Sequence, residues 1–365
     1  MSTQTTKCPN CGGPLHFDPE KQLNTCEYCL SEFTNQELVD YSKRQAEAGL
    51  EDPSPEISEP HDHVHNEDAG AHGEEDRMIE YTCNSCGAHV VTEDTTSATF
   101  CYYCHNPVII TERLSGEFRP DKVIPFHFSR EKAVQTFLNW VKRYKYVPKS
   151  FYSDSQLAKM TGLYVPNWMA KVDADIQYDG VGTRIRVWRV GDIEYTEFKE
   201  YGISRSGKIK LDNLTEIGMR KIDHGLLNSI GPYDETKAVD FNANYLNGFF
   251  SEKYDIEKED VRPLMLERSK KYSDSLVRNS VTAYDKIKFS KSNVQPQVKS
   301  LEYVLLPVWI LTYQYNQKTY IYAVNGQTGK TYGEIPLDSK RLGATSLMIA
   351  AALLVLLLLG GALIW

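Results

Sequence analysis

Eight cysteines, all within the first 104 residues, form four C-x2-C pairs. The pairs fall into two sets of the same design, because 14 residues separate the two pairs of each set and the sets are offset by 75 residues. The first set is Cys8, Cys11, Cys26 and Cys29, and the second is Cys83, Cys86, Cys101 and Cys104. A glycine follows the second cysteine of each set (Gly12 and Gly87) and permits the positive φ of a tight metal-binding turn. This spacing predicts metal sites.

Each set supplies four thiolates, which suit a tetrahedral Zn²⁺ ion and leave no open coordination position. We therefore predict two structural zinc ions, each stabilising a ribbon of about 30 residues that is too small to fold on a core of its own. Iron held by four thiolates is chemically possible, and the sequence does not decide between the two metals. Redox-active pairs are the weaker alternative, because each pair has a partner pair at the same distance. The nearby His16, His89 and His105 are expected to be surface residues.

The ribbons are predicted at 1–44, which includes a short helix from about residue 35, and at 78–112. Between them, residues 45–77 are expected to form a disordered, acidic, His-rich linker. Its segment 45–76 has eleven acidic residues, three prolines and no Lys or Arg, a composition that cannot form a core. His61, His63, His65 and His72 either hold a metal loosely or are simply solvated.

Residues 113–338 have the composition of an ordinary globular body, and their periodicity predicts an α+β fold with antiparallel sheets. Helical spacing occurs at 129–144, 236–254 and 258–279. Alternating residues predict strands at 162–180, 183–190, 193–201, 207–211, 284–291 and 298–315. Turns are expected at YDGVG (178–182) and VGD (190–192), and a hairpin is expected over 303–324.

Two pentapeptides of the body resemble each other, YVPNW at 164–168 and LLPVW at 305–309. Each is expected to open a strand pair after a helical stretch, since proline is tolerated at the first position of a strand. The likeness predicts an internal duplication of two α+β units. The alternative is that both are edge-strand entries whose Trp168 and Trp309 fill the core.

Residues 325–331 read NGQTGKT and resemble a shortened phosphate loop. A functional loop has the spacing G-x-x-x-x-G-K-[ST] and continues into a helix, whereas YGEIP follows here. We predict a Gly-rich hairpin turn without nucleotide binding. The sequence also shows no local nucleophile–base pattern, which favours a protein that is not an enzyme.

Residues 347–365 read LMIAAALLVLLLLGGALIW and carry no charge. At about 1.5 Å per residue, a helix of this length crosses the ~30 Å hydrocarbon core of a bilayer, and residues 342–346 extend it. Lys340 and Arg341 precede it and place the body in the cytoplasm by the positive-inside rule. Because the chain opens without the features of a signal peptide, we predict a single-pass, tail-anchored protein of the cell membrane. The alternative is a buried core helix.

The net charge of −8 is unevenly distributed. Residues 1–112 carry 5 basic and 21 acidic residues, whereas 113–365 carry 36 and 28. Phosphate contacts need Lys or Arg, so the acidic ribbons disfavour nucleic acid and suit a protein partner. Either one face of the basic body lies against anionic lipid headgroups, or its lysines are simply scattered over the surface. Its basic clusters are Lys142/Arg143/Lys145/Lys149, Lys208/Lys210/Arg220/Lys221 and Arg268/Lys270/Lys271.

The combined order of two C-x2-C-G…C-x2-C ribbons, YVPNW, LLPVW, AVNGQTGKTYGEIP and an apolar C-terminal helix resembles a bacterial family, the TFIIB-type zinc ribbon-containing membrane proteins. The resemblance covers nearly the whole chain. It implies that all eight cysteines ligate zinc. It also implies a membrane adaptor linked with phage-shock-protein-A-like and SPFH/virion-core-like proteins in envelope stress.

The expected function is therefore that of a membrane-anchored zinc-ribbon adaptor or scaffold that recruits cytoplasmic proteins to the membrane. One alternative is a membrane-tethered, nucleic-acid-associated regulator that binds DNA or RNA through its ribbons. The other is an enzyme whose site lies in residues 113–338.

Overall fold

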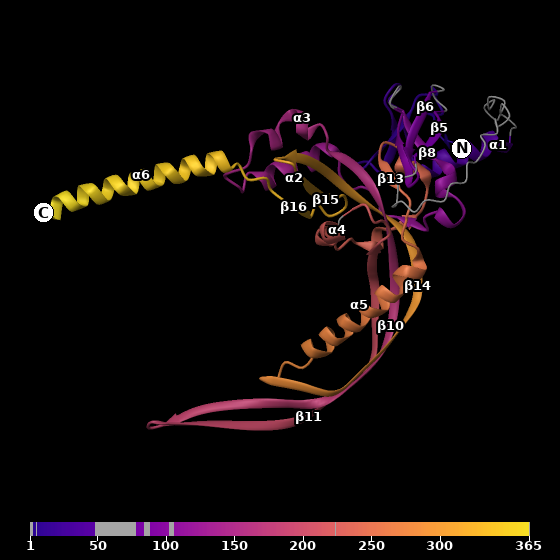
Figure 1. The fold of residues 1–365 in the computed structure, drawn as a ribbon. Helices are drawn as coiled ribbons and strands as arrows, with labels where there is room; N and C mark the ends of the chain where they lie inside the picture. Colours follow the sequence, from indigo (N-terminus) through magenta and orange to yellow (C-terminus); the bar gives the residue numbers. More distant parts are fainter. Residues whose placement is uncertain are drawn as a thin grey trace, which may run out of the picture.

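The computed structural model describes residues 3–4, 6–47, 78–83, 88–101, 106–222 and 224–364. They form a head, a long curved arm that leaves the head, and one helix that projects from it (Figure 1). The helices are α1 (Asn35–Glu47), α2 (Arg130–Val141), α3 (Asp154–Leu157), α4 (His224–Ile230), α5 (Lys258–Asn279) and α6 (Ser339–Ile364). The 3-10 helices are η1 (Thr111–Leu114), η2 (Gly116–Phe118), η3 (Lys149–Tyr152), η4 (Glu235–Lys237) and η5 (Ala243–Leu246).

One large, mostly antiparallel sheet joins the head to the arm. Its strands run in the order β1-β8-β7-β13-β10-β14-β15-β16, with β11 on β10 and with β9 and β12 beside β14. These strands are β1 (Thr3–Gln4), β7 (Thr96–Phe100), β8 (Pro107–Ile110), β9 (Lys122–Val123), β10 (Thr161–Val190), β11 (Ile193–Ile217), β12 (Val239–Asp240), β13 (Phe250–Glu252), β14 (Lys286–Tyr315), β15 (Lys318–Asn325) and β16 (Thr331–Gly333). The α+β body with antiparallel pairing is therefore confirmed.

The two pentapeptides lie opposite each other in this sheet, because Tyr164 pairs with Pro307 and Pro166 pairs with Leu305. Both prolines lie inside long strands, so the prediction that they open strands is wrong. On its other edge β10 changes neighbour between residues 164 and 167, from β13 to β11. β14 changes likewise between residues 305 and 308, from β9 to β15. Proline has no backbone N–H to donate. It is tolerated at both places because the strand has no hydrogen-bonded neighbour on that edge there.

The side chains around these motifs form the core of the head. Trp168 and Trp309 are each 4% exposed, and the ring of Phe126 stacks on Phe249 at 4.3 Å and contacts Trp309 at 4.9 Å. The expectation that both tryptophans fill the core is confirmed. The duplication itself stays a prediction.

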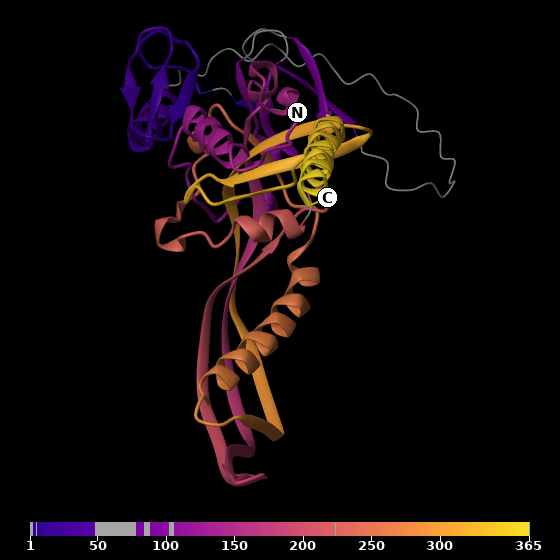
Figure 2. The same cartoon turned by 90° about the vertical axis from the view of Figure 1, so that its left-hand side faces the viewer.

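The arm consists of β10, β11 and β14, with α5 packed along it (Figures 1 and 2). The buried residues of α5 recur every fourth position, at Val261, Met265, Ser269, Ser273 and Val277. This is one face of a helix, and its two serines have no large side chains to hold the helix away from the strands. The predicted helix at 258–279 is confirmed to the residue.

The predicted turn at YDGVG is wrong, because β10 runs straight through it. The register shifts between Asp179 and Gly180, where β14 contains an extra residue. A Cβ built on Gly180 would lie 2.4 Å from the backbone oxygen of Lys288. The glycine is thus required by the close approach of a neighbouring backbone at a bulge, not by a turn. The turn at VGD is confirmed, since β10 ends at Val190 and β11 begins at Ile193.

The helix predicted over 236–254 is also wrong. This segment contains η4, β12, η5 and β13 instead. The side chain of Asn242 accepts a hydrogen bond from the backbone of Asn244, and Gly248 has φ +89°. Local side-chain bonding of this kind competes with helix formation. The buried residues Phe241, Leu246 and Phe249 then anchor the irregular chain in the core.

The other helices and strands predicted from the sequence differ from those in the structure mainly in where they begin and end. The strands predicted at 193–201 and 207–211 are one strand, β11, and those at 284–291 and 298–315 are one strand, β14. Helix α2 begins after Ser129, as expected, although its side chain makes no capping bond. The NGQTGKT segment is the predicted turn between β15 and β16. Buried Asn325 accepts hydrogen bonds there from the backbone of Gln327 and of Thr328, each at 2.9 Å.

Helix α6 projects from the head, and it is long and apolar enough to cross a membrane. Its described apolar side chains are exposed, from Leu347 at 73% to Leu357 at 74%. Asp338 caps its first turn by accepting the backbone N–H of Arg341 at 3.1 Å. A soluble core helix would bury such residues, so the alternative of a core helix is not supported.

The arm is tied to α5 by an ion pair, and we predict that breaking this pair loosens the helix. Arg268 Nη1 lies 2.9 Å from the Glu216 carboxylate, which is 7% exposed, and donates to Thr215 O at 2.7 Å. Arg268→Ala should cost about 1–3 kcal/mol, less than a fully buried pair because Arg268 is partly exposed. Amide hydrogen exchange of α5 should speed up accordingly. The control Lys271→Ala removes the exposed pair with Glu267 and should change exchange little; equal effects of both variants would contradict the prediction.

Candidate metal centre

The first four cysteines lie on two tight turns at one end of a small sheet. The sheet consists of β2 (Leu15–Asp18), β3 (Leu23–Cys26) and β4 (Glu32–Phe33), followed by α1. In the first turn the backbone N–H of Cys8 donates to Gly13 O (2.7 Å) and Gly12 adopts φ +74°. This confirms the reason for a glycine after Cys11.

The second turn repeats the first without a glycine. The N–H of Cys26 donates to Ser31 O (2.9 Å), and Leu30 takes the left-handed conformation at φ +59°. A leucine rarely adopts this backbone conformation. The turn is therefore held in place by its surroundings rather than by local preference.

The four sulfurs converge on one point. Cys8 Sγ lies 3.6 Å from Cys29 Sγ, Cys11 Sγ lies 3.5 Å from Cys26 Sγ, and the ligand atoms of all four lie within 4.8 Å of one another. Four sulfurs about 2.3 Å from a zinc ion would lie about 3.8 Å apart. The group therefore fits one tetrahedral metal ion, with Cys8 and Cys26 buried and Cys11 and Cys29 exposed.

The thiols of this cluster differ in acidity. Hydrogen bonds with the side chain and the backbone of Ser31 lower the pKa of Cys29 to about 6. The backbone of Gly13 favours the Cys11 thiolate, but hydrogen bonds with the sulfurs of Cys26 and Cys29 outweigh it and raise the pKa of Cys11 to about 12. Crowded sulfurs cannot all ionise without a cation among them, which is the chemistry of a metal-thiolate site.

Of the nearby histidines, His16 lies beside the cluster without joining it. Its Nε2 is 3.6 Å from the carboxylate of Glu27, and burial lowers its pKa. The side chains of His89 and His105 lie outside the described residues, as do His61, His63, His65, His72 and most of 45–77.

The first ribbon is docked on the head through buried polar groups. Asn247, 1% exposed, donates its side-chain N–H to Asn24 Oδ1 at 3.0 Å, and its O accepts the N–H of Phe17 at 2.9 Å. Phe17 also contacts the ring of Tyr245 at 5.1 Å. The four-cysteine cluster therefore has a fixed place on the head.

Of the second set, the structure describes Cys83 and Cys101, while Cys86 and Cys104 lie outside the described residues. Both described cysteines are buried in one apolar cluster with Tyr81. The N–H of Cys83 donates to Ala88 O at 2.8 Å, and that of Cys101 donates to Asn106 O at 3.0 Å. Each bond spans five residues, like the bonds that begin at Cys8 and Cys26.

The strands around the second set are not all part of a separate ribbon. β5 (Met78–Thr82) pairs with β6 (His89–Glu93), whereas β7 and β8 belong to the large sheet, where β7 contacts β13. The side chain of Ser97 bonds Ser251 across this contact at 3.0 Å. Sequence reasoning missed this integration because the pairing joins residues more than 150 positions apart.

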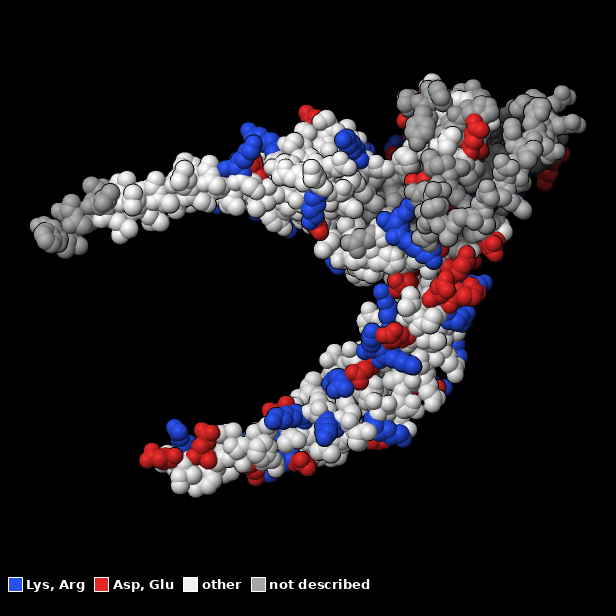
Figure 3. All heavy atoms as spheres, viewed as in Figure 1, with Lys and Arg blue, Asp and Glu red and all other residues white. Residues whose placement is uncertain are grey.

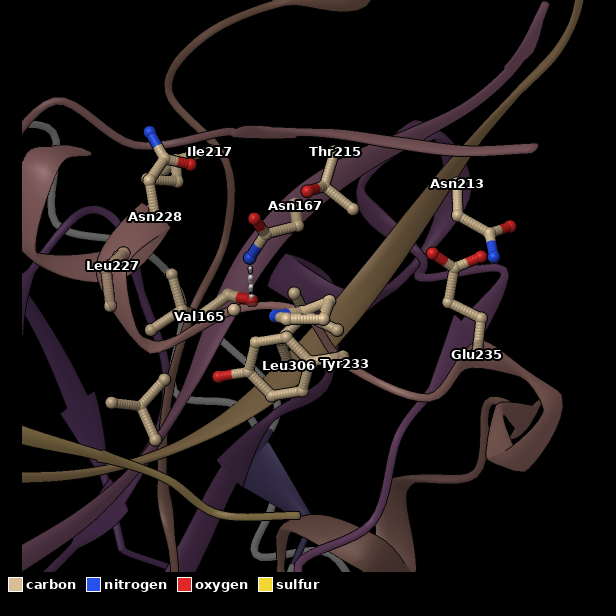
Figure 4. Close-up of a pocket in the computed structure, with 13 residues that line it drawn as sticks. Val165, Asn167, Asn213, Thr215, Ile217, Leu227, Asn228, Tyr233, Glu235 and Leu306 are labelled. Atoms are coloured by element: carbon tan, nitrogen blue, oxygen red, sulfur yellow. Dashed lines mark hydrogen bonds between the residues drawn. The ribbon is translucent and has the colours of Figure 1, made fainter. Parts of the chain in front are cut away.

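A separate pocket of about 160 Å³ lies between the end of β11, the neighbouring parts of β10 and β14, and α4 with the segment that follows it (Figure 4). Its polar lining includes Asn167, Asn213, Thr215 and Glu235. Burial, reinforced by neighbouring acids, raises the pKa of Glu235 to about 7. Sequence reasoning missed this pocket, since its residues are far apart in the chain. Its lining residues offer hydrogen bonds but no paired nucleophile and base, so it identifies no reaction.

The chain is similar over nearly its whole length to a curated bacterial protein. The chain is 31% identical over 360 residues to "Uncharacterized protein YdjG" of Bacillus subtilis (strain 168), and the match covers 97% of this chain and 98% of the relative. No family model matches the chain. No solved structure matches it.

We predict that Cys11→Ser removes one bound metal ion per chain, because three thiolates and a hydroxyl bind zinc far more weakly than four thiolates. Cys11 is exposed, so the change disturbs packing little. Metal analysis of the purified full chain measures the loss. His16→Ala is the matched control and should keep the full metal content. Unchanged metal in Cys11→Ser would show that the four sulfurs do not form a metal site.

Proposed function

The chain belongs to the family of the Bacillus subtilis protein YdjG, and we propose that it acts as a membrane-anchored adaptor that displays zinc ribbons to cytoplasmic proteins. The observation that carries this proposal is the placement of two features in one chain. The four-cysteine cluster is docked on the head, and the apolar helix α6 leaves the head on another side (Figures 1 and 2). One feature suits recognition and the other suits attachment.

The metal in this proposal is zinc with a structural role. Four cysteine ligands fill a tetrahedral zinc site and leave no position for a substrate. We propose a second zinc ion at Cys83, Cys86, Cys101 and Cys104. The support for it is that the N–H groups of Cys83 and Cys101 each donate to the carbonyl five residues later. The same backbone hydrogen bond is present at both turns of the first cluster.

The anchor in this proposal is α6, with the head in the cytoplasm. Lys340 and Arg341 lie in its first turn, on the side of the head, where the positive-inside rule places cytoplasmic residues. Their charges also suit the anionic inner leaflet. The backbone N–H of Asp338 donates to Tyr146 O at 2.8 Å, which holds the start of the helix close to the head rather than on a long tether.

The partner in this proposal is a protein rather than a nucleic acid. Residues 1–112 carry 21 acidic and 5 basic residues, and phosphate backbones are repelled by such a surface. An exposed, metal-stiffened turn with Tyr28 and Leu30 at 75% exposure each offers apolar contact to a protein surface.

We expect two zinc ions per full-length chain, and we expect Cys83→Ser to remove one of them. Serine at position 83 leaves the proposed second site with three thiolates, which lowers its affinity for zinc. Elemental analysis after purification without added metal measures both values and separates zinc from iron. Loss of one ion from Cys11→Ser but none from Cys83→Ser would restrict the protein to a single site.

The adaptor function is tested by capture from detergent-solubilised membranes with the tagged full-length chain. The intact protein and His16→Ala should retain the same proteins, whereas Cys8→Ser/Cys83→Ser should retain them at least about tenfold less, because the ribbons unfold without metal. Equal capture by all three variants would contradict the proposal. Salt-sensitive capture of DNA or RNA in place of proteins would instead favour a nucleic-acid regulator.

A further inference from the structure

The end of the arm is a two-stranded hairpin that the rest of the molecule does not cover. β14 begins at Lys286, which lies opposite Thr183, so β10 and β11 extend past this point without a third strand. We call residues 185–198 the distal hairpin. A two-stranded ribbon of this kind is marginally stable on its own in water.

The distal hairpin carries an unusual share of exposed apolar side chains. Six of its residues are between 40% and 61% exposed: Val187, Trp188, Val190, Ile193, Tyr195 and Phe198. The two cross-strand pairs nearest the turn on one face are Val190 with Ile193 and Trp188 with Tyr195. The rings of Trp188 and Tyr195 stack at 5.6 Å. Val187 and Phe198 lie on the opposite face. Exposed apolar side chains gathered in this way mark a binding surface.

The distal hairpin carries two basic and three acidic residues, including Asp192 in its turn. Arg189 lies opposite Glu194, and Arg186 lies opposite Glu197. The guanidinium of Arg186 also lies 5.6 Å from the ring of Trp188. Figure 3 shows mixed red, blue and uncharged surface at the end of the arm. With a net charge of only −1, the hairpin has little attraction to a strongly charged partner, and the apolar side chains near its turn decide what it binds.

The direction of the arm identifies the occupant. The arm curves so that its tip and α6 lie on the same side of the head and extend the same way (Figure 1). Seen from that side, α6 points toward the viewer and the hairpin lies below it (Figure 2). A bilayer crossed by α6 would thus meet the tip of the hairpin as well. Trp and Tyr are the residues that favour the membrane–water interface, and arginine side chains extend from it toward water.

We propose that the distal hairpin inserts its tip into the interface of the same membrane leaflet that α6 enters, giving the protein a second point of attachment. The inference rests on the proposed membrane anchor. Because its net charge is only −1, the hairpin does not depend on anionic lipid and inserts into neutral phosphatidylcholine. Two attachment points set the orientation of the head above the membrane, which a single helix does not.

The test uses the fluorescence of Trp188 in the full-length chain. The chain has five tryptophans, of which Trp140, Trp168 and Trp309 are buried in the head. Trp365→Phe removes the tryptophan at the end of the apolar segment, so that Trp188 is the one remaining tryptophan open to lipid. The protein is reconstituted into phosphatidylcholine vesicles whose acyl chains carry bromine near the headgroups, and flotation is measured on the same sample.

We expect brominated lipid to reduce the Trp188 contribution by about half, as for an aromatic residue at the interface. The contribution is the difference between Trp365→Phe and Trp365→Phe/Trp188→Phe. Ile193→Asp should abolish this quenching while flotation is unchanged. The matched control Leu264→Asp places the same charge at an exposed leucine of α5 and should leave quenching intact.

The outcomes separate the hairpin from the anchor. A protein that floats while Trp188 is not quenched overturns this inference and leaves the anchor standing, and it points to a protein partner or a second copy at the tip. A protein that does not float overturns the anchor and, with it, this inference. Quenching that is the same in Ile193→Asp also overturns it.

Discussion

The antiparallel ladder between β10 and β14 is the interaction on which the rest of the structure depends. It runs from Thr161 opposite Ile310 to Thr183 opposite Lys286. Its first part lies in the head, where Tyr164 and Trp309 join the core, and its second part is the arm. This ladder, with its two bulges, places the distal hairpin relative to the head, because a slip of one residue would move every side chain beyond it to the opposite face.

The shape of the arm follows from interruptions of that ladder. The register shifts between Lys171 and Val172 and again between Asp179 and Gly180. Bulges of this kind bend a strand and increase its twist, which accounts for an arm that curves instead of extending straight from the head. Packing then stiffens the bend: Tyr178 is 1% exposed and contacts the ring of Phe289 at 5.2 Å.

The sequence predicted those features that depend on residues close together in the chain. The turn at Gly12, the hairpin around residues 316–317 and the helix at 258–279 each follow from local spacing and periodicity. The convergence of the first four sulfurs was predictable for the same reason. The structure describes only half of the second set, so its metal site stays a prediction.

The sequence did not predict features that depend on distant partners. Gly180 resembled a turn residue because its neighbour, the backbone of β14, lies more than 100 positions away. The irregular segment 236–254 has apolar residues at helical spacing, which suggested a helix. Its buried side chains instead pack into the core from an irregular backbone. The pairing of β7 with β13 was likewise out of reach.

The chain positions the four-cysteine cluster in a different way from the two proposed membrane attachments, which are α6 and the distal hairpin. The cluster folds locally and is then fixed to the head by the buried Asn24–Asn247 hydrogen bond, so it cannot swing on the linker that follows it. The hairpin is positioned by the long ladder, and the start of α6 is tied to the head by the hydrogen bond from the N–H of Asp338 to Tyr146 O. A flexible tether would let a displayed ribbon search for partners. Here all three features are held by the head, so a partner of the kind proposed would approach the ribbon from the direction that the head allows. A membrane that held both α6 and the hairpin would fix that direction, which makes orientation, rather than reach, the property that this architecture controls.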